Sequence, residues 1–305
     1  MTERSTMTDQ QASDRVHLRA PAKVNLILRV LDRRPDGFHN LWSLMQAVAL
    51  EDELELRRRR DSQETRLFCP DASVPTDHRN LVVRAASLVL QRSGQAVGLD
   101  IELTKRIPVG AGLGGGSSDA AATIVGLNRL LDLGWSRDEM AALGQELGSD
   151  VPFFFFPPSA IVQGKGDKVR PIQLAGERWV LLVQPGFPVE TKWAYEQLAR
   201  TRLGPRPLSK ALEALEAVAT AGALSWNDVI PLMENDFEEV LRPTHGVFGE
   251  IKRHMLSQGA EVALLSGTGS TVFGLFNSER DANRARTPLQ QAGKNWTGVA
   301  RTSSR

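Results

Sequence analysis

A glycine-rich loop dominates this chain, and its sequence is Pro108-Val109-Gly110-Ala111-Gly112-Leu113-Gly114-Gly115-Gly116-Ser117-Ser118-Asp119. Five of the seven residues from 110 to 116 are glycine, so side chains barely obstruct the backbone N–H groups. An Ala-rich helical pattern follows over residues 117–131, and the amino terminus of a helix carries about half a positive charge. The loop and the helix start together predict a phosphate-binding site. The other interpretation is a tight turn in front of a glycine-packed helix.

The loop alone does not show which kind of phosphate-containing ligand it binds. Residues 110–115 satisfy the pattern G-x-G-x-x-G, and Asp132 lies about twenty residues downstream, as in dinucleotide-binding proteins. However, Asp132 belongs to the expected end of a helix, and residues 105–108 (KRIP) precede the loop where that fold needs a plain hydrophobic strand. The sequence also lacks G-x-x-x-x-G-K-[ST] and the H-R-D and D-F-G triplets of protein kinases. A dinucleotide-dependent oxidoreductase remains the alternative from a different enzyme class.

The rest of the pattern mixes strands and helices without steady βαβ alternation, which predicts the α+β class. Alternating apolar residues predict strands at 16–31 (broken near Pro21), 46–56, 97–103, 159–163, 168–174, 179–184, 262–265 and 271–276. Helical spacing predicts helices at 80–92, 117–131, 136–147, 191–200, 208–220, 227–241, 244–258 and 279–292. We expect Asn80 to cap the first of these helices, and Ser136 with Glu139 to form a capping box on the third.

The composition is that of an ordinary globular protein. The 37 basic and 36 acidic residues give a net charge of +1, so no electrostatic argument favours a nucleic acid or a membrane surface as partner. No apolar stretch approaches the roughly 18 residues that a membrane-spanning helix needs. The single cysteine, Cys69, cannot form an intramolecular disulfide, which fits a cytoplasmic protein. We expect the polar residues 1–15 to be a disordered tail and not a secretory signal.

Three segments, taken in order, resemble the motifs of the galactokinase, homoserine kinase, mevalonate kinase and phosphomevalonate kinase (GHMP) superfamily. They are residues 20–26 (APAKVNL), the loop from 108 to 118, and residues 265–273 (LSGTGSTVF). This resemblance implies a two-lobed α+β fold, with an N-terminal nucleotide-binding lobe and a C-terminal lobe that closes on the substrate. With Pro157-Pro158 as the hint of a boundary, we expect domains at 16–160 and 161–305.

Three further segments resemble one branch of the superfamily, which uses ATP to phosphorylate a hydroxyl of a cytidine-diphosphate polyol. These segments are residues 33–39 (RRPDGFH), 149–154 (SDVPFF) and 235–238 (NDFE). The resemblance implies a small-molecule kinase. We expect it to act as a monomer or weak homodimer. Another kinase of the superfamily, of the mevalonate or homoserine type, is the nearest alternative, and residues 33–39 argue against it.

The resemblance also implies that Lys23 and Asp150 converge on the acceptor hydroxyl. Asp150 is the expected base, while Lys23 lowers the pKa of the hydroxyl and steadies the transferred group. The alternative is a buried structural ion pair, an arrangement that is rarely stabilising. Asn25 faces the same side of a strand as Lys23, so we expect it to hydrogen-bond the acceptor. A polar residue at a strand edge is the other interpretation of Asn25.

The remaining expected ligand contacts divide between nucleotide and acceptor. The resemblance assigns ATP to Pro108, Val109, Gly110, Ala111, Gly112, Leu113, Gly114, Gly115, Gly116, Ser117 and Ser118, with Asn80 and Lys105 near the adenine. Mg²⁺ accompanies the nucleotide, and either Ser117 or Ser118 is its candidate ligand. For the acceptor, Phe38 stacks on cytosine where the family usually has tyrosine, and His39 hydrogen-bonds the edge of the base. Thr191 belongs to the wall of the acceptor site.

Overall fold

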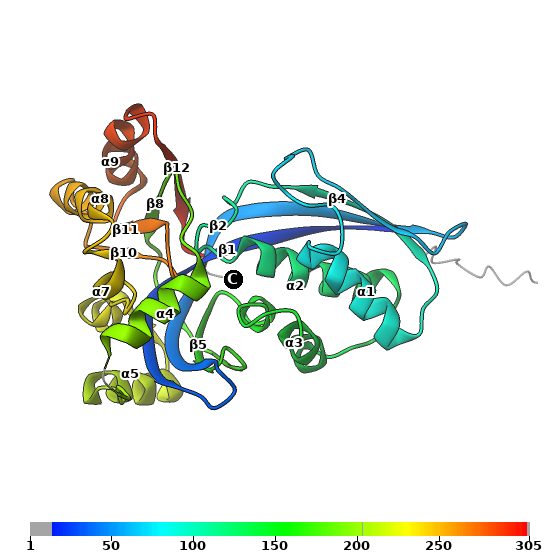
Figure 1. Cartoon of the computed structure of the whole chain (residues 1–305), viewed down its shortest axis with the longest axis horizontal. Coiled ribbons are helices and arrows are strands. Elements are labelled where there is room, and N and C mark those ends of the chain that lie inside the picture. Colours follow the sequence, from blue (N-terminus) through cyan, green and yellow to red (C-terminus); the bar gives the residue numbers. More distant parts are fainter. Residues whose placement is uncertain (1–13, 203, 304–305) are drawn as a thin grey trace, which may run out of the picture.

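The structure, a computed structural model, describes residues 14–202 and 204–303. Its longest elements are the antiparallel strands β1 (Arg15–Arg33) and β2 (His39–Arg59), which extend through both halves of the molecule (Figure 1). They pair with each other and, in the described residues, belong to a six-stranded sheet. Five of its strands follow the order β3-β4-β2-β5-β6, and β1 pairs with β2 outside this order. The other strands of this sheet are β3 (Thr65–Phe68), β4 (Gly98–Thr104), β5 (Ser159–Gly164) and β6 (Lys168–Pro171).

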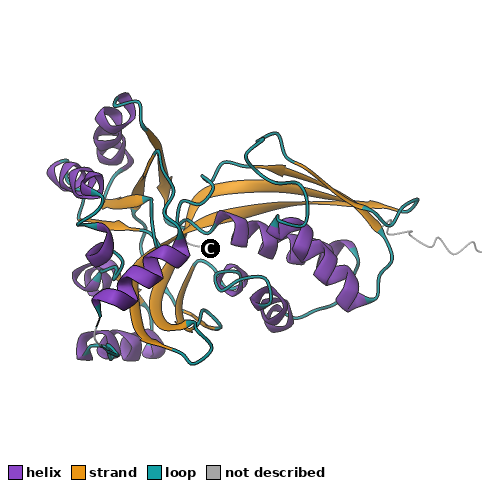
Figure 2. Cartoon of the chain, in the orientation of Figure 1, coloured by secondary structure: helices purple, strands orange, loops and turns teal. Residues whose placement is uncertain are grey.

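Helices α1 (Leu81–Ser93) and α2 (Gly115–Leu130) lie against this sheet, and α3 (Arg137–Gln145) packs beside α2 (Figure 2). Their shared core includes fully buried side chains of the sheet and of both helices, namely Leu56, Leu99, Ile101, Val89, Ile124 and Leu127. Burial of each such side chain contributes about 1.5–3 kcal/mol to folding. This core fixes the amino terminus of α2, and with it the end of the glycine-rich loop.

A second, antiparallel sheet forms the other half of the molecule. Its order is β10 (Val262–Leu265), β11 (Val272–Phe276), β8 (Trp179–Pro185) and β12 (Asn295–Arg301). The helices around it are α4 (Thr191–Thr201), α5 (Lys210–Ala221), α6 (Trp226–Val229), α7 (Glu238–Leu241), α8 (Gly246–Ser257) and α9 (Glu279–Gln291). Short elements complete the chain: η1 (Pro152–Phe155), η2 (Ile230–Leu232), β7 (Leu174–Ala175) and β9 (Leu224–Ser225).

The α+β class is confirmed, and so are the two predicted caps. Asn80 accepts a hydrogen bond from the Val82 N–H at 2.9 Å, and Ser136 and Glu139 form the capping box of α3. Pro21 does not end a strand, because β1 absorbs it at a bulge on an edge of the sheet. The expected helix over 227–241 is wrong: the chain there forms α6, η2 and α7, and Pro231 lies where a continuous helix would need its N–H.

The domain boundary and the alternative fold also differ from the structure. Residue 160 falls inside β5, and β5 pairs with β2, so the first sheet extends to Pro171. The strand before the glycine-rich loop, β4, pairs antiparallel with β2, and Asp132 follows the end of α2 instead of a parallel strand. The dinucleotide-binding alternative therefore lacks its fold.

The expected tail covers residues 1–15, and its residues 1–13 lie outside the described part of the chain. Arg15, its last residue, already begins β1. None of the helices in the described part of the chain is long and apolar enough to span a membrane.

Candidate active site

The three motif segments meet at the amino terminus of α2. The backbone N–H of Lys23 in β1 donates to the carbonyl oxygen of Leu113 at 2.9 Å. The hydroxyl of Ser266, which follows β10, donates to the carbonyl oxygen of Gly112 at 2.9 Å. The first and third motif segments therefore both hold the glycine-rich loop between the two sheets.

The approach of the third segment to the loop requires glycine at position 112. Gly112 has a φ of +77°, and a Cβ atom there would lie 2.2 Å from the carbonyl oxygen of Ser266. Any side chain would force the two segments apart, so this glycine serves close backbone packing as well as backbone freedom.

Helix α2 begins without a side-chain cap. Its N-cap residue is Gly114, with a φ of +70° and no side-chain hydrogen bond. The first N–H groups of a helix have no acceptor within the helix itself. Among the described residues, the N–H groups of Gly115, Gly116 and Ser117 have no acceptor elsewhere either. Three free donors at the positive end of a 16-residue helix form an anion site. Ser117 lines the adjacent cavity, whereas the Ser118 hydroxyl is buried without a hydrogen-bond partner in the described residues.

Lys23 and Asp150 face each other beside this helix start. The Lys23 ammonium lies 3.3 Å from Oδ2 of Asp150, and the two side chains are 3% and 37% exposed. Lys23 also donates to Oδ1 of Asn25 at 2.6 Å. The lysine is thus enclosed and oriented, while the carboxylate remains open to the cavity.

Asn25 connects the first motif segment to the third. Its Oδ1 also accepts a hydrogen bond from the Gly267 N–H at 3.0 Å, and its Nδ2 donates to the Ser43 hydroxyl at 2.8 Å. These contacts fix the amide orientation. Asn25 lines the cavity, and one N–H of its amide has no acceptor in the described structure.

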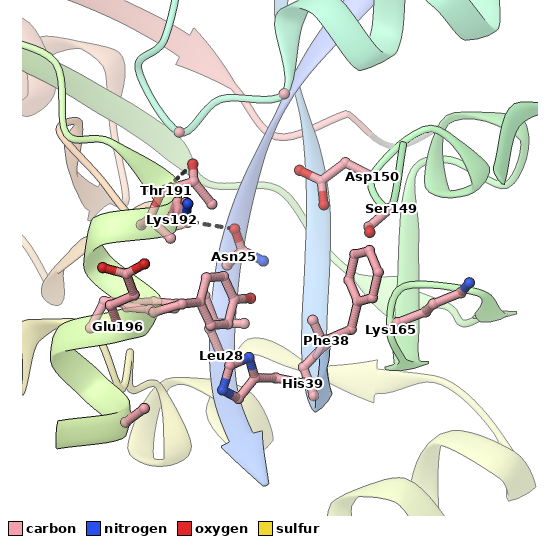
Figure 3. Close-up of a pocket in the computed structure, with 18 of the residues that line it drawn as sticks. Asn25, Leu28, Phe38, His39, Ser149, Asp150, Lys165, Thr191, Lys192 and Glu196 are labelled. Carbon is pink, nitrogen blue, oxygen red and sulfur yellow. Dashed lines mark hydrogen bonds between the residues drawn. The ribbon is translucent and has the colours of Figure 1, made fainter. Parts of the chain in front are cut away.

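A cavity of about 980 Å³ extends from the helix start along β1 and α4. Figure 3 shows Asp150 on one side of it and Thr191 and Lys192 on the other, with Asn25 on the strand between them. Within the described chain, four cationic side chains of the lining make no ion pair, namely Arg33, Lys165, Lys192 and Arg200. Their excess over the carboxylates of Asp150 and Glu196 makes the cavity suited to an anionic ligand.

Aromatic rings form the end of the cavity farthest from the helix start. The rings of His39 and Tyr195 stack with centroids 4.9 Å apart, and Tyr195 contacts Phe237 edge-on at 4.8 Å. Phe38 is 55% exposed, and its ring lies across the opening from His39 (Figure 3). The Lys165 ammonium lies 5.7 Å from the centroid of the Phe38 ring. Phe38, His39 and Tyr195 all line the cavity, and aromatic faces are surfaces on which flat rings stack.

The pKa values of two of these side chains, His39 and Tyr195, differ from the usual values. Burial lowers the pKa of His39, and the charge of Arg33 lowers it further, so the imidazole is neutral at pH 7. Burial raises the pKa of the Tyr195 phenol, and the nearby charge of Asp150 adds to this effect. Both side chains therefore offer neutral hydrogen-bonding groups to a ligand.

The Asn235–Glu238 segment supports the third motif segment. Nδ2 of Asn235 donates to the carbonyl oxygens of Leu265 and Gly267, each at 2.8 Å. Across the cavity, the hydroxyls of Thr191 and Thr268 lie 3.2 Å apart. The turn from 267 to 269 is thereby held from two sides.

Comparison with known proteins identifies the family. The model of GHMP kinases N terminal domain matches residues 80–157, and that of GHMP kinases C terminal matches residues 208–295. The chain is 41% identical over 286 residues to the 4-diphosphocytidyl-2-C-methyl-D-erythritol kinase of Citrifermentans bemidjiense, across 94% of this chain and 98% of the relative. The chain belongs to the 4-diphosphocytidyl-2-C-methyl-D-erythritol kinase family.

Other relatives agree with this membership. The same-named kinase of Geobacter sulfurreducens is 41% identical, over 93% of this chain and 97% of the relative. A crystal structure of 4-(cytidine 5'-diphospho)-2C-methyl-D-erythritol kinase matches with a TM-score of 0.75 at 34% identity, over 93% of this chain and 99% of that one. A homoserine kinase from Cytophaga hutchinsonii, 21% identical with a TM-score of 0.73, shares the fold. This chain is accordingly an ATP-dependent small-molecule kinase, as the sequence predicted.

Two expected adenine-contact residues of this kinase have other partners. The side chain of Asn80 caps α1 and donates to the carbonyl oxygen of Pro75 at 2.7 Å. The ammonium of Lys105 lies between the carboxylates of Asp52 and Asp119. Both side chains therefore have structural contacts in the described chain, and their contact with a nucleotide stays a prediction.

Several residues that are candidates for a functional role in this kinase were not predicted from the sequence. Tyr195 lies four residues after Thr191, the expected acceptor-site residue, but its stacking with His39 joins residues far apart in sequence. Lys165 and Lys192 were not predicted as ligand contacts, although Lys192 directly follows Thr191. The carboxylates Asp52 and Asp119 were not considered either, although Asp119 directly follows the two serines of the loop.

Proposed function

We propose that this kinase transfers the γ-phosphoryl group of ATP to the 2-hydroxyl of 4-diphosphocytidyl-2-C-methyl-D-erythritol, in the methylerythritol phosphate route to isoprenoid precursors. One observation carries the proposal: the Lys23–Asp150 pair, 3.3 Å apart, lies between an uncapped helix start and a cavity that ends in aromatic rings. A triphosphate fits the first of these surfaces and a pyrimidine nucleotide fits the second. The pair lies where their reacting ends would meet.

In the proposed reaction, the hydroxyl oxygen of the acceptor attacks the γ-phosphorus, and the bond from this phosphorus to the bridging oxygen of ADP breaks. The hydroxyl proton passes to the carboxylate of Asp150. The ammonium of Lys23 stabilises negative charge on the attacking oxygen and on the transferred group. The free N–H of the Asn25 amide orients the acceptor.

The nucleotide is proposed to lie along the loop from Pro108 to Ser118. Its phosphates accept hydrogen bonds from the free N–H groups of Gly115, Gly116 and Ser117. Asn80 and Lys105 are proposed to lie near the adenine, where Asn80 also caps α1 and the Lys105 ammonium also contacts Asp119.

Mg²⁺ fits this site as an ion that the nucleotide mainly holds. In the described part of the chain, no group of three His, Cys, Asp or Glu side chains could bind a metal by itself. The hydroxyl of Ser117 at the cavity, or the unpartnered hydroxyl of Ser118, supplies one protein oxygen. When bound, the ion neutralises phosphate charge during transfer.

The acceptor is proposed to bind with its cytosine stacked on Phe38 and with an edge of the base toward His39. Neutral His39 hydrogen-bonds the edge of the base, and Thr191 contributes to the wall beside the polyol. The unpaired cations Lys165 and Lys192 complement the diphosphate. This arrangement directs the polyol hydroxyl toward Asp150.

We also propose that the kinase acts in the cytoplasm as a monomer or weak homodimer. The lone Cys69 suits a reducing compartment, and both sides of the cavity come from one chain. Analytical ultracentrifugation from nanomolar to micromolar concentration tests the assembly state. A tight dimer at nanomolar concentration would contradict it.

An ADP-release assay with a panel of acceptors tests the proposed function. The panel contains 4-diphosphocytidyl-2-C-methyl-D-erythritol, mevalonate and homoserine, each with ATP and Mg²⁺. We expect release with the first compound alone. Release with mevalonate or homoserine instead would overturn the acceptor assignment while leaving a kinase of the superfamily.

A further inference from the structure

A chain of buried hydrogen bonds runs from strand β2 to the Lys23 ammonium. The hydroxyl of Ser43 donates to the carbonyl oxygen of Ile27 at 2.7 Å and accepts a hydrogen bond from Nδ2 of Asn25 at 2.8 Å. Oδ1 of Asn25 in turn accepts a hydrogen bond from Lys23 at 2.6 Å. Ser43, Asn25 and Lys23 are 0%, 1% and 3% exposed. Because these side chains are shielded from water, their protein partners determine how each of them is oriented.

A bulge in β1 brings Ser43 into this position. Asn25 pairs with Met45 of β2, whereas Ile27 pairs with Leu44. Strand β1 therefore contains one extra residue over this interval, which is a β-bulge. Side chains alternate along β2, so Ser43 lies on the same face as Met45, which lines the cavity. From this face the Ser43 hydroxyl satisfies the carbonyl oxygen of Ile27 beside the bulge and reaches the Asn25 amide.

The chain has one direction of hydrogen-bond donation. A serine hydroxyl has a single proton, and a carbonyl oxygen accepts that of Ser43, so toward Asn25 this hydroxyl can only accept. The Asn25 amide must then present its NH₂ group to Ser43. Its oxygen faces two donors, the Lys23 ammonium and the Gly267 N–H at 3.0 Å. An inverted amide would place donors against donors, so only one orientation satisfies all these partners.

This orientation decides what Asn25 can offer to an acceptor hydroxyl. Both lone pairs of its Oδ1 are occupied, whereas one N–H of its Nδ2 has no acceptor among the described residues. Asn25 can therefore donate to the oxygen of the acceptor but cannot take its proton. The carboxylate of Asp150, which lines the cavity 3.3 Å from the Lys23 ammonium, can accept that proton.

We propose that Ser43 is a positioning residue for phosphoryl transfer. Its hydroxyl holds the Asn25 amide so that the amide oxygen keeps the Lys23 ammonium in place. The free N–H of the same amide then directs the proton of the acceptor toward Asp150. Ser43 is fully buried and does not line the cavity, so it acts through Asn25. The inference rests on the proposed function, in which Lys23, Asn25 and Asp150 act on the acceptor hydroxyl.

Ser43→Ala removes the hydroxyl and leaves the Asn25 amide without its anchor on β2. We expect kcat to fall about 10-fold to 10²-fold, because a misplacement of about 1 Å can cost about 10²-fold in rate. The KM for ATP should stay unchanged, since the start of α2 is not altered.

Ser159→Ala is the matched control, because Ser159 is also a buried serine, on the neighbouring strand β5. It is 2% exposed, and its hydroxyl donates to Oε1 of Gln46 at 2.5 Å. This variant should lower the free energy of unfolding, as Ser43→Ala does, without lowering kcat. Steady-state kinetics and urea unfolding of both variants measure these effects.

A double-substitution cycle with Asn25→Ala shows whether Ser43 acts through the amide. Residues that act as a unit have strongly non-additive effects on kcat. Ser43→Ala should therefore slow the wild-type chain but cause no further loss in the Asn25→Ala background. If Ser43→Ala does not fold, Ser43→Cys takes its place, because the thiol is only a weak hydrogen-bonding group.

The outcomes separate this inference from the proposed function. A wild-type kcat in the Ser43 variant, an equal loss of kcat in Ser159→Ala, or the same fold-loss in both backgrounds of the cycle contradicts the inference alone. Absence of turnover of 4-diphosphocytidyl-2-C-methyl-D-erythritol by the wild-type chain overturns the proposed function and this inference with it.

Discussion

Asp150 and Glu196 both contribute carboxylates to the cavity, but Asp150 is the one that lies beside Lys23, 3.3 Å from its ammonium. We expect Asp150→Asn to lower kcat by about 10²–10⁴-fold, the usual contribution of a positioned base, with nearly unchanged ATP affinity. Steady-state kinetics with both substrates measures this. Glu196→Gln is the matched control and should retain catalysis. An Asp150→Asn variant with more than half the wild-type activity would remove this carboxylate from the mechanism.

Phe38 tests recognition of the base at the residue scale. Its ring is 55% exposed at the cavity mouth, so Phe38→Ala should fold normally and lose about 1–3 kcal/mol of acceptor binding, the range for base–aromatic stacking. Phe38→Tyr should be almost neutral because either ring presents a stacking face. The measurement is kcat/KM for the cytidine-containing acceptor.

Phe68 provides the control for this substitution, since it is 51% exposed on β3, outside the cavity. Phe68→Ala should leave kcat/KM unchanged. Wild-type kcat/KM in Phe38→Ala would show that the ring does not contact the base.

At the scale of elements, phosphate binding at the start of α2 can be tested with a substitution that does not disturb the fold. A Cβ atom on Gly116 would be no closer than 3.8 Å to Leu81, and Gly116 has no positive φ. Gly116→Ala should therefore keep or raise the free energy of unfolding, since alanine favours a helix by up to about 1 kcal/mol. It should weaken ATP binding because the methyl group meets the phosphates.

The control for Gly116 is Gly249→Ala in α8, where a Cβ atom also has open space. It should raise stability without changing ATP affinity. Urea unfolding and ATP titration of both variants measure these effects. Unchanged ATP affinity in Gly116→Ala would contradict a phosphate site at this helix start.

Local sequence signals predicted the elements whose causes are local. The caps at Asn80 and Ser136 depend on residues a few positions apart, and both are present. The expected helix at 227–241 failed because apolar spacing outweighed Pro231 in the prediction. Strand β12 was missed because its residues 295–301 carry little alternation, and their place is set by pairing with the distant β8.

At the scale of the whole molecule, Asn235 links the segment before α7 to the third motif segment. Its amide satisfies the buried carbonyl oxygens of Leu265 and Gly267. We expect Asn235→Ala to lower the free energy of unfolding by about 1–3 kcal/mol for each oxygen left unpaired. Asn283→Ala in α9, whose amide makes a surface hydrogen bond to the carbonyl oxygen of Glu279, is the control in the same urea experiment and should cost little. Equal unfolding midpoints for wild type and Asn235→Ala would refute this linking role.

Sequence motifs predicted part of the candidate site. The residues that only the fold brings together could not be predicted from the sequence. The sequence suggested Lys23, Asn25 and the loop, and the structure brings them together. No spacing rule could reveal that Tyr195 stacks on His39, because 155 residues separate them and only the packing of α4 against β1 and β2 joins them. The same reason hid the contact of Asp52 with Lys105.

The central claim is that a cytidine diphosphate handle positions a polyol hydroxyl between Lys23 and Asp150. The most direct measurement compares kcat/KM for 4-diphosphocytidyl-2-C-methyl-D-erythritol with that for 2-C-methyl-D-erythritol 4-phosphate, which lacks the cytidine moiety. Because remote binding energy helps orient the reacting group, the truncated compound should lose turnover as well as affinity. Equal kcat and KM for the two compounds would contradict the account and leave the aromatic end of the cavity without a role in recognition.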